Sequence, residues 1–434
     1  MTQPYAIQGD VHPARLLHGF SGPVHLPGEA GYDERRRSLN PSVDPRPLLV
    51  AEAAHEDDVR TALLAARRHG LPFAVQATGH GTHAGCDGGI VVNTSAMASV
   101  LVDPGRRIAR VGPGARWGEV IAACAPFGLA PLSGSSPSVG VTGYTLGGGL
   151  GWLARRHGFA ADSVVRARVL TADGRHVTAD AGRHPDLFWA LRGGGGGFGV
   201  VTSLEFRLHP VSEVYAGFAY FPIEGAAETL AAYRDWIERI PDALSTAVVL
   251  RRMPDDAATP EPLRGRRVLM VKAVHAGEAD DARRLLAPLW RAAGPALLDE
   301  TAPMPYARTA MGGTAARHLD LFDALPDEVI GTLVEASEHA RTVEVRHWGG
   351  AMGRPGPDAG PVSRRSTRLS VIVDTPPPGL AEALRPHANG GTFLNFLTDP
   401  SRTASAFAPD DLRRLREIKH AYDPDAFFRV GHTV

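Results

Sequence analysis

Three clusters of glycine constrain this chain more than any other feature of its sequence. They lie at Gly79-His80-Gly81, at residues 147–151 and at residues 193–199, and each is framed by apolar sequence. Glycine adopts positive φ angles without steric cost, and its missing side chain lets backbone N–H groups approach a ligand closely. Loops of this kind cradle a pyrophosphate. Three of them in one chain therefore predict a dinucleotide site, rather than flexible loops without a ligand.

The third cluster contains a GxGxxG match whose context excludes a nicotinamide-binding fold. Gly194, Gly196 and Gly199 satisfy the pattern, but residues 186–192 before them are helix-like and residues 200–206 after them predict a strand. A Rossmann site requires the reverse order, with the strand first and the helix second. The match is therefore rejected as a nicotinamide fingerprint.

Length and charge limit the classes of partner. The 434 residues, 44% hydrophobic and 21% charged, suffice for two or three cores, and a net charge of -1 without runs of like charge disfavours nucleic acid. Residues 1–22 contain neither a basic leader nor a continuous apolar stretch, and no apolar run of about 18 residues occurs anywhere. We expect a cytoplasmic protein without a membrane span. Cys86 and Cys124 have no metal-like spacing, which predicts neither a disulfide framework nor a metal site. The preference for arginine over lysine is typical of a GC-rich bacterial genome.

Residues 45–210 predict short strands separated by glycine turns and by two or three helices. A helix is expected from Glu56 to Gly70, because acidic residues favour its start and glycine its end. Strands are expected at residues 46–51, 73–77, 89–94, 99–102, 108–111, 164–171 and 176–179. Strands that succeed one another without a helical crossover indicate an α+β domain and not a doubly wound sheet.

From residue 211 to about residue 389 the pattern changes to longer helices alternating with apolar strands. Helices are expected at 226–240, 279–293 and 326–340, and strands at 246–250, 268–274, 343–347 and 369–373. This predicts a second domain built on an antiparallel sheet, with a loop at 354–361. The C-terminal part predicts a strand at 392–397 and a helix that carries Leu415, Ile418 and Tyr422 on one face.

Six collinear blocks of sequence resemble one known family. They are QATGHGT at 76–82, SVGVTGYTLGGGLGW at 138–152, DSV at 162–164, PDLFWALRGGGGGFGV at 185–200, NF at 395–396 and YDP at 422–424. Together they are similar to the berberine-bridge-enzyme-like FAD-linked oxidases, which have the PCMH-type FAD-binding fold of the vanillyl-alcohol oxidases. The resemblance implies an α+β FAD-binding domain made of residues 1–209 and 386–434, and an inserted substrate domain of residues 210–385 with an antiparallel sheet flanked by helices.

The resemblance also implies a cofactor and the residues that hold it. FAD is expected to be attached covalently through His80. The residues expected to contact it are Thr78, Gly79, His80, Gly81, Thr82, Ser136, Ser138, Val139, Gly140, Gly143, Tyr144, Gly148, Gly149, Gly151, Asp162, Gly199, Val200 and Asn395.

Two positions depart from the family pattern. Many members attach the flavin a second time through a cysteine, where this chain has Ser136, so a single histidyl link is expected. Members also commonly use a tyrosine two residues before the asparagine, where this chain has Phe393. Phenylalanine cannot accept a proton, so the base must lie elsewhere.

The remaining candidates for a catalytic base are Tyr144, Tyr306 and His347, since burial or a nearby arginine can shift the pKa of a tyrosine or histidine. Each has a plain alternative as a packing, surface or sheet residue. Phe393, Asn395 and Trp348 are candidates to contact substrate. Asn395 has an equal alternative as a cap of backbone groups, and Trp348 lies on the strand face opposite to His347.

The function implied is an FAD-dependent oxidase that transfers a hydride from an organic small molecule to flavin and then two electrons to dioxygen, giving hydrogen peroxide. A secondary metabolite, an alcohol or a sugar is the expected substrate class. A flavin-dependent cyclase or desaturase of natural-product biosynthesis, and a flavin-binding protein without turnover, are the alternatives. The sequence gives no indication of oligomeric state.

Overall fold

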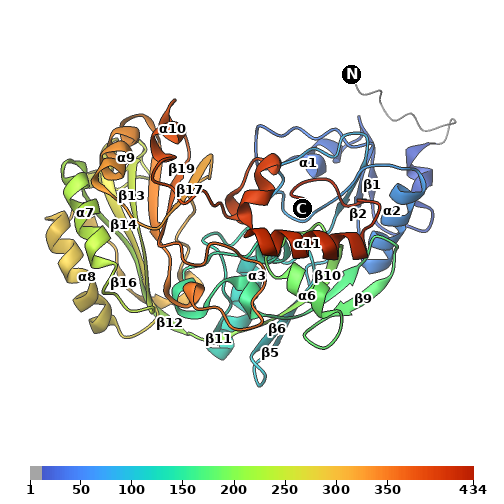
Figure 1. The fold of residues 1–434 in the computed structure, drawn as a ribbon, viewed down its shortest axis with the longest axis horizontal. Coiled ribbons are helices and arrows are strands. Elements are labelled where there is room, and N and C mark those ends of the chain that lie inside the picture. The colour runs from blue at the N-terminus through green and yellow to red at the C-terminus, as the bar shows by residue number, and fades with distance from the viewer. Residues whose placement is uncertain (1–11) are drawn as a thin grey trace.

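Four β-sheets organise the chain into two lobes (Figure 1). The computed structural model describes residues 12–434, so the expected absence of a leader in residues 1–22 falls partly outside it. Within the described range, no helix is long and apolar enough to cross a membrane.

The first lobe holds three of the sheets. The four-stranded sheet has the order β1 (Val24–His25), β2 (Leu49–Glu52), β4 (Ile90–Asn93), β3 (Phe73–Gln76), with β4 parallel to both β2 and β3. The antiparallel five-stranded sheet has the order β5 (Val100–Asp103), β6 (Ile108–Val111), β10 (Val200–Arg207), β8 (Val164–Leu170), β9 (His176–Ala179). A two-stranded sheet pairs β7 (Leu129–Ala130) with β11 (His209–Pro210). The helices of this half are α1 (Tyr32–Arg36), α2 (Glu56–Arg68), α3 (Trp117–Cys124), α4 (Val141–Leu146), α5 (Ala154–His157) and α6 (Pro185–Leu191).

The second lobe is an eight-stranded antiparallel sheet. Its order is β15 (Leu298–Asp299), β12 (Glu213–Pro222), β14 (Arg267–His275), β13 (Leu244–Arg252), β18 (Thr342–His347), β19 (Leu369–Val373), β17 (His318–Phe322), and β16 (Ala302–Pro305) also pairs with β12. Helices α7 (Ala226–Trp236), α8 (Ala279–Ala293) and α9 (Asp327–His339) cover one face, and α10 (Leu380–Leu384) joins them (Figure 1). In α8, Ala282, Leu286 and Leu289 recur at helical spacing and are buried against this face. Part of the opposite face packs against the first lobe, where Ala247 and Val274 of the sheet contact Trp152 and Leu153.

The C-terminal segment returns to the first lobe. Helix α11 (Pro409–Tyr422) packs beside α6, although more than 200 residues separate the two in sequence (Figure 1). Lys419 of α11 donates hydrogen bonds to the carbonyl oxygens of Gly197 (2.6 Å) and Phe428 (2.9 Å) and pairs with Asp423. The third glycine cluster is thereby fastened to the end of the chain.

Most expected elements are present within a few residues, but one expected strand is absent. Residues 392–397 do not form a strand, because Leu394–Phe396 curl into a 3-10 turn, η8, that points the Asn395 side chain at another loop. Strand β12 was not expected, because Gly217 interrupts its apolar pattern. Gly217 has φ +145°, and a Cβ there would lie 2.4 Å from the carbonyl oxygen of Glu300, so the crossing chain requires glycine. The rejection of the GxGxxG match is confirmed, since α6 precedes the glycines and β10 follows them.

Candidate active site

The first glycine loop follows the edge strand β3 and presents His80. Gly79 has φ +75°, and a side chain at Gly81 would meet no atom within 4 Å, so the loop borders open space. Thr82 holds the loop's shape by donating a hydrogen bond to Gln76 Oε1 (3.0 Å). The pKa of His80 is lowered by desolvation and by the positive charge of Arg116. An unprotonated imidazole nitrogen is therefore available at neutral pH, which a covalent bond to carbon requires.

The second loop meets the first at the histidine. His80 Nε2 lies 3.1 Å from Ser138 Oγ, and Ser138 Oγ lies 2.9 Å from Ser136 Oγ. A Cβ added at Gly140 would contact the Thr78 side chain at 3.3 Å, so the two loops are packed closely. Ser136 thus stands in the immediate neighbourhood of His80, where the family pattern places a second attachment residue. The carbonyl oxygen of Val139 accepts a hydrogen bond from the backbone N–H of Trp117 (3.0 Å), which connects this loop to α3.

The glycine cluster at residues 147–151 is fixed by hydrogen bonds to Asn395, which lies near the C-terminal end of the chain. Its Nδ2 donates to the carbonyl oxygen of Tyr144 (2.9 Å), and its Oδ1 accepts from the N–H of Gly149 (2.8 Å). Gly148 and Gly149 have φ values of +111° and +78°, conformations that side chains disfavour. Both polar ends of the Asn395 side chain are therefore used on loop backbone, which corresponds to the capping alternative.

The other expected cofactor residues have mainly structural contacts. Asp162 receives two hydrogen bonds from Arg365 (3.0 and 2.7 Å) and one from the N–H of Phe159 (3.0 Å). Gly199 has φ +150°, and a Cβ there would lie 2.5 Å from Val169. Val200 is buried and begins β10. These residues thus have contacts within the protein that fix the conformation of the loops.

The arrangement fits a dinucleotide. Side chains added at Gly81, at Gly143 in α4 or at Gly196 would meet nothing within 4 Å. Two buried polar atoms beside the loops, His83 Nδ1 and Thr142 Oγ1, have no hydrogen-bond partner among the described residues. Buried polar groups are nearly always satisfied, so these two atoms are available to a polar ligand. FAD would be such a ligand, and the glycine loops and His80 are the residues that would hold it.

Tyr144, the first choice of base from sequence, faces away from solvent. Its hydroxyl oxygen is buried and has no hydrogen-bond partner in residues 12–434. Its ring packs edge-on against Trp117 (5.4 Å between centroids), and a Cβ at Gly149 would lie 2.6 Å from that ring. Burial raises the pKa of Tyr144, with the charge of Arg346 opposing that shift only in part. The phenol therefore stays protonated near neutral pH and is poorly suited to accept a proton.

Tyr306 and His347 are engaged elsewhere. The Tyr306 hydroxyl lies 2.8 Å from Ser133 Oγ and 3.1 Å from the carbonyl oxygen of Pro131, and burial raises the pKa of Tyr306 to about 12. His347 Nε2 accepts a hydrogen bond from Arg155 (2.8 Å), and burial beside that guanidinium lowers the pKa of His347 to about 2. Its accepting nitrogen is thus already occupied. The roles of all three residues as proton acceptors stay predictions, and flavin reduction by variants at these positions tests them.

Phe393 and Trp348 belong to one aromatic cluster beside the second loop. Phe393 is stacked with Phe159 (5.5 Å) and meets Trp348 edge-on (5.4 Å). The Trp348 indole donates to Ser370 Oγ (2.9 Å). A Cβ at Gly148 would lie 3.0 Å from the Phe393 ring, so phenylalanine here is a wall of the glycine loop.

The two tyrosines make a matched pair for mutation. We expect Tyr144→Phe to leave the free energy of unfolding unchanged or raise it, because it removes a buried hydroxyl without a partner. Tyr306→Phe is expected to cost about 1–3 kcal/mol, because Ser133 and Pro131 lose their partner. Both variants should still reduce flavin anaerobically within a few-fold of wild type, as followed by stopped-flow absorbance. A loss of about a hundredfold or more in either would restore that phenol as the base.

Comparison with known proteins shows an FAD-binding domain in this chain. The family described as FAD binding domain matches residues 47–180, and the family described as berberine and berberine like matches residues 392–434. The chain thus contains an FAD-binding domain and a berberine-like C-terminal segment, and the named proteins similar to it are FAD-linked oxidoreductases and oxidases. An uncharacterized FAD-linked oxidoreductase of Bacillus subtilis, YgaK, is 27% identical over 96% of this chain and 97% of its own length. The (R)-6-hydroxynicotine oxidase of Paenarthrobacter nicotinovorans is 35% identical over 46% of this chain and 44% of its own.

Solved structures of such oxidoreductases have the same fold. The 6-hydroxy-D-nicotine oxidase of Arthrobacter nicotinovorans superposes with a TM-score of 0.82 at 25% identity, over 100% of this chain and 99% of its own. A berberine-bridge-enzyme-like protein of Physcomitrella patens has a TM-score of 0.84 at 20% identity, over 96% and 97%.

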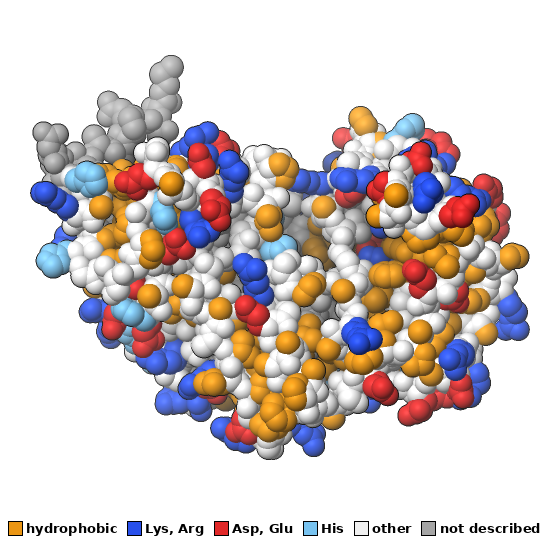
Figure 2. All heavy atoms as spheres, turned by 180° about the vertical axis from the view of Figure 1, so that it is seen from behind, with side chains coloured by type: hydrophobic (Ala, Val, Ile, Leu, Met, Phe, Trp, Pro, Cys, Tyr) orange, Lys and Arg blue, Asp and Glu red, His pale blue; other side chains and the backbone are white. Residues whose placement is uncertain are grey.

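In this FAD-linked oxidoreductase, sequence reasoning missed a buried pair of charged side chains on the face of the large sheet opposite α7, α8 and α9. Lys272 Nζ lies 3.1 Å from Glu344 Oε2, and both side chains are almost fully buried. Arg346, on the same face, donates to the carbonyl oxygen of Gly151 (2.8 Å) and stacks on Trp152. The surface is hollowed between the two lobes, with basic side chains beside the hollow (Figure 2). The alternation of Glu344 and Arg346 within an apolar strand was the available signal, since residues two apart share a strand face.

Proposed function

We propose that this chain is an oxidase that carries FAD on His80 by one covalent bond and oxidises a small organic molecule at the expense of dioxygen. The observation that carries the proposal is the meeting of His80 with Ser138 and Ser136 where the first two glycine loops border open space. When bound, FAD supplies the centre that takes up a hydride and passes the electrons to dioxygen, with release of hydrogen peroxide.

The chain's own residues would bind and orient. We propose that residues 1–209 and 386–434 hold the cofactor, with Asn395 fixing the second loop, and that residues 210–385 present the substrate. Arg346 links the two parts through its hydrogen bond to Gly151. The aromatic cluster around Phe393 excludes water from the adjoining side of the loop.

The substrate proposal rests on relatives. Proteins similar to this chain include a xylooligosaccharide oxidase of Thermothelomyces thermophilus as well as the hydroxynicotine oxidase. We propose a secondary metabolite, an alcohol or a sugar. The apolar Phe393 in place of a proton-accepting tyrosine favours a second candidate, an oxidative cyclase or desaturase, in which the net reaction is not an alcohol oxidation.

A substrate panel tests the proposal. The purified protein is expected to lose its flavin absorbance anaerobically with at least one alcohol, sugar, amine or polyketide, and to release one hydrogen peroxide per substrate oxidised in air. Product structure then separates the oxidase from the cyclase. A protein that binds FAD but is bleached by none of the panel would support the third alternative, binding without turnover.

A further inference from the structure

One connection of the large sheet contacts two of the three glycine clusters. It consists of residues 348–368, which join β18 to β19. Val362 of this connection is buried. A Cβ added at Gly193 would collide with the Val362 side chain, and one added at Gly148 would lie 3.3 Å from it. The second lobe therefore borders the second and third glycine clusters directly.

Arg365 of the same connection forms a bidentate ion pair with Asp162 of the first lobe. Its two terminal nitrogens lie 2.7 and 3.0 Å from the two carboxylate oxygens, one nitrogen on each oxygen. The two side chains are only 11% and 19% exposed. The guanidinium also lies over the ring of Phe159, 5.2 Å from its centroid. Such a bidentate pair fixes the orientation of both side chains as well as their distance.

Asp162 belongs to a 3-10 turn, η3 (Ala160–Ser163), that holds the second glycine cluster. The backbone N–H groups of the first two residues of η3 donate hydrogen bonds to the carbonyl oxygens of Gly149 and Gly148 (2.9 Å each). Both glycines lie in the part of the chain that matches the FAD-binding domain. Because a bonded carbonyl group fixes the direction of its peptide plane, η3 sets the conformation of this loop. The ion pair of Arg365 thus acts on the loop through η3.

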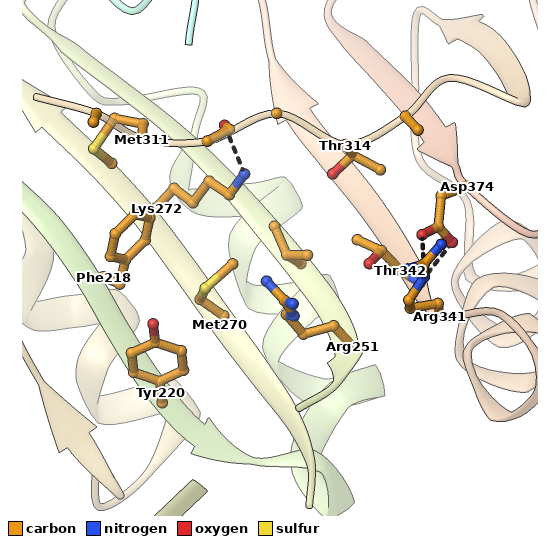
Figure 3. Close-up of a pocket in the computed structure, with 15 residues that line it drawn as sticks. Phe218, Tyr220, Arg251, Met270, Lys272, Met311, Thr314, Arg341, Thr342 and Asp374 are labelled. Atoms are coloured by element: carbon orange, nitrogen blue, oxygen red, sulfur yellow. Dashed lines mark hydrogen bonds and ion pairs between the residues drawn. The ribbon is translucent and has the colours of Figure 1, made fainter. Parts of the chain in front are cut away.

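A cavity on the large sheet is a separate feature of the second lobe. It has a volume of about 460 Å³ and lies on the face opposite α7, α8 and α9 (Figure 3). Among residues 12–434, those that line it include Phe218, Met270 and Lys272, and none belongs to residues 348–368 or to a glycine cluster. A change of Arg365 therefore leaves the lining of this cavity intact.

We propose that Arg365 is a positioning residue for the cofactor. By holding Asp162 it keeps η3, and through η3 the peptide groups of Gly148 and Gly149, in the conformation that receives FAD. The second lobe thereby takes part in cofactor binding. A loop that is ordered before its ligand arrives costs less free energy to immobilise, so the effect is on FAD affinity. The inference rests on the proposed cofactor site and does not require turnover.

Titration of FAD into the His80→Ala variant tests this inference. That background is expected to bind FAD dissociably, and quenching of flavin fluorescence measures the Kd. Adding Arg365→Gln should raise the Kd about 5- to 50-fold. Arg365→Lys should raise it less, because lysine keeps the charge and loses the planar fork of donors.

Arg368→Gln is the matched control in the same background. Arg368 lies on the same connection, is exposed, and forms an ion pair with Glu238 of its own lobe. Loss of an exposed ion pair has little effect on its surroundings, so the Kd should stay within about twofold of the background value.

A double-mutant cycle with Asp162→Asn shows whether Arg365 acts through Asp162. If it does, the two changes together should weaken FAD binding no more than the stronger single change. Circular dichroism verifies that each FAD-free protein is folded, and urea denaturation measures its stability separately from its affinity.

Three results would overturn the inference. They are an unchanged Kd in Arg365→Gln, effects of Arg365→Gln and Asp162→Asn that add, and an equal loss of affinity in Arg368→Gln. Should Arg365→Gln fail to fold, Arg365→Lys gives the same comparison. A protein that oxidised nothing would still bind FAD and report these values of Kd, so failure of the oxidase proposal and failure of this inference are distinguishable.

Discussion

Replacing His80 with alanine is expected to release all of the FAD into the supernatant when the protein is precipitated with acid, whereas the wild-type pellet stays yellow. His80 is exposed, and its one side-chain hydrogen bond is to Ser138, so the fold should tolerate its loss. The glycine loops are fixed by other contacts, among them Asn395 on Gly149 and Lys419 on Gly197. The variant should therefore bind FAD, but dissociably. Absorbance of pellet and supernatant measures the partition.

Ser138→Ala is the matched control, since it removes the hydrogen bond to the imidazole and keeps the imidazole itself. It should retain the flavin in the pellet, and peptide mapping should find the modification on His80 alone. Flavin in the wild-type supernatant, or linked to another residue, would contradict covalent attachment through His80. A His80→Ala protein that fails to fold would also count against the assignment.

The sequence predicted the helices and loops whose conformation depends on residues near one another in the chain. The helix expected at 279–293 is α8 to the residue, because acidic residues at its start, a periodic apolar face and a positive-φ glycine at its end all agree. The cofactor loops were predictable for a related reason, since glycines at positive φ cannot be replaced by other residues without strain.

Side-chain contacts between residues far apart in the sequence could not be predicted from the sequence. Asn395 could equally contact a ligand or cap backbone until Gly149 and Tyr144, about 250 residues earlier, were placed beside it. Tyr144 lies next to the glycine loop in sequence, yet its ring turns inward against Trp117. The position of Tyr144 in the sequence indicated that it lies beside the glycine loop, but not which way its side chain points. Lys272 and Glu344 are 72 residues apart and meet only because β13 lies between β14 and β18.

Breaking the ion pair of Lys272 and Glu344 is expected to cause a large loss of stability. Glu344→Gln is expected to lower the free energy of unfolding by about 3–5 kcal/mol, because it leaves the buried ammonium group of Lys272 without a countercharge. Thr314 also loses a charged acceptor, which weakens the attachment of residues 312–314 to the sheet. Urea denaturation followed by circular dichroism measures the change.

Two controls separate charge burial from a general effect of mutation. The double variant Lys272→Met with Glu344→Leu should regain most of the lost stability, because it replaces the pair with apolar side chains of similar volume. Asp280→Asn, which breaks the exposed pair with Arg283 on α8, should change stability little. A double variant as unstable as Glu344→Gln would mean that side-chain shape, and not the unpaired charge, sets the cost.

The pH dependence of the free energy of unfolding tests the ion pair of Lys272 and Glu344 independently. Burial alone would raise the pKa of Glu344, but the charges of Lys272 and Arg346 outweigh it and hold the pKa below its ordinary value of 4.5. A carboxylate whose pKa is lowered on folding contributes stability that is complete above its unfolded pKa and is lost as the pH falls through the folded pKa. Wild-type stability should therefore fall more steeply below pH 4.5 than that of the double variant. Parallel curves would show that Glu344 carries no net charge in the folded protein, and the ion pair would then not be what fastens residues 312–314 over the sheet.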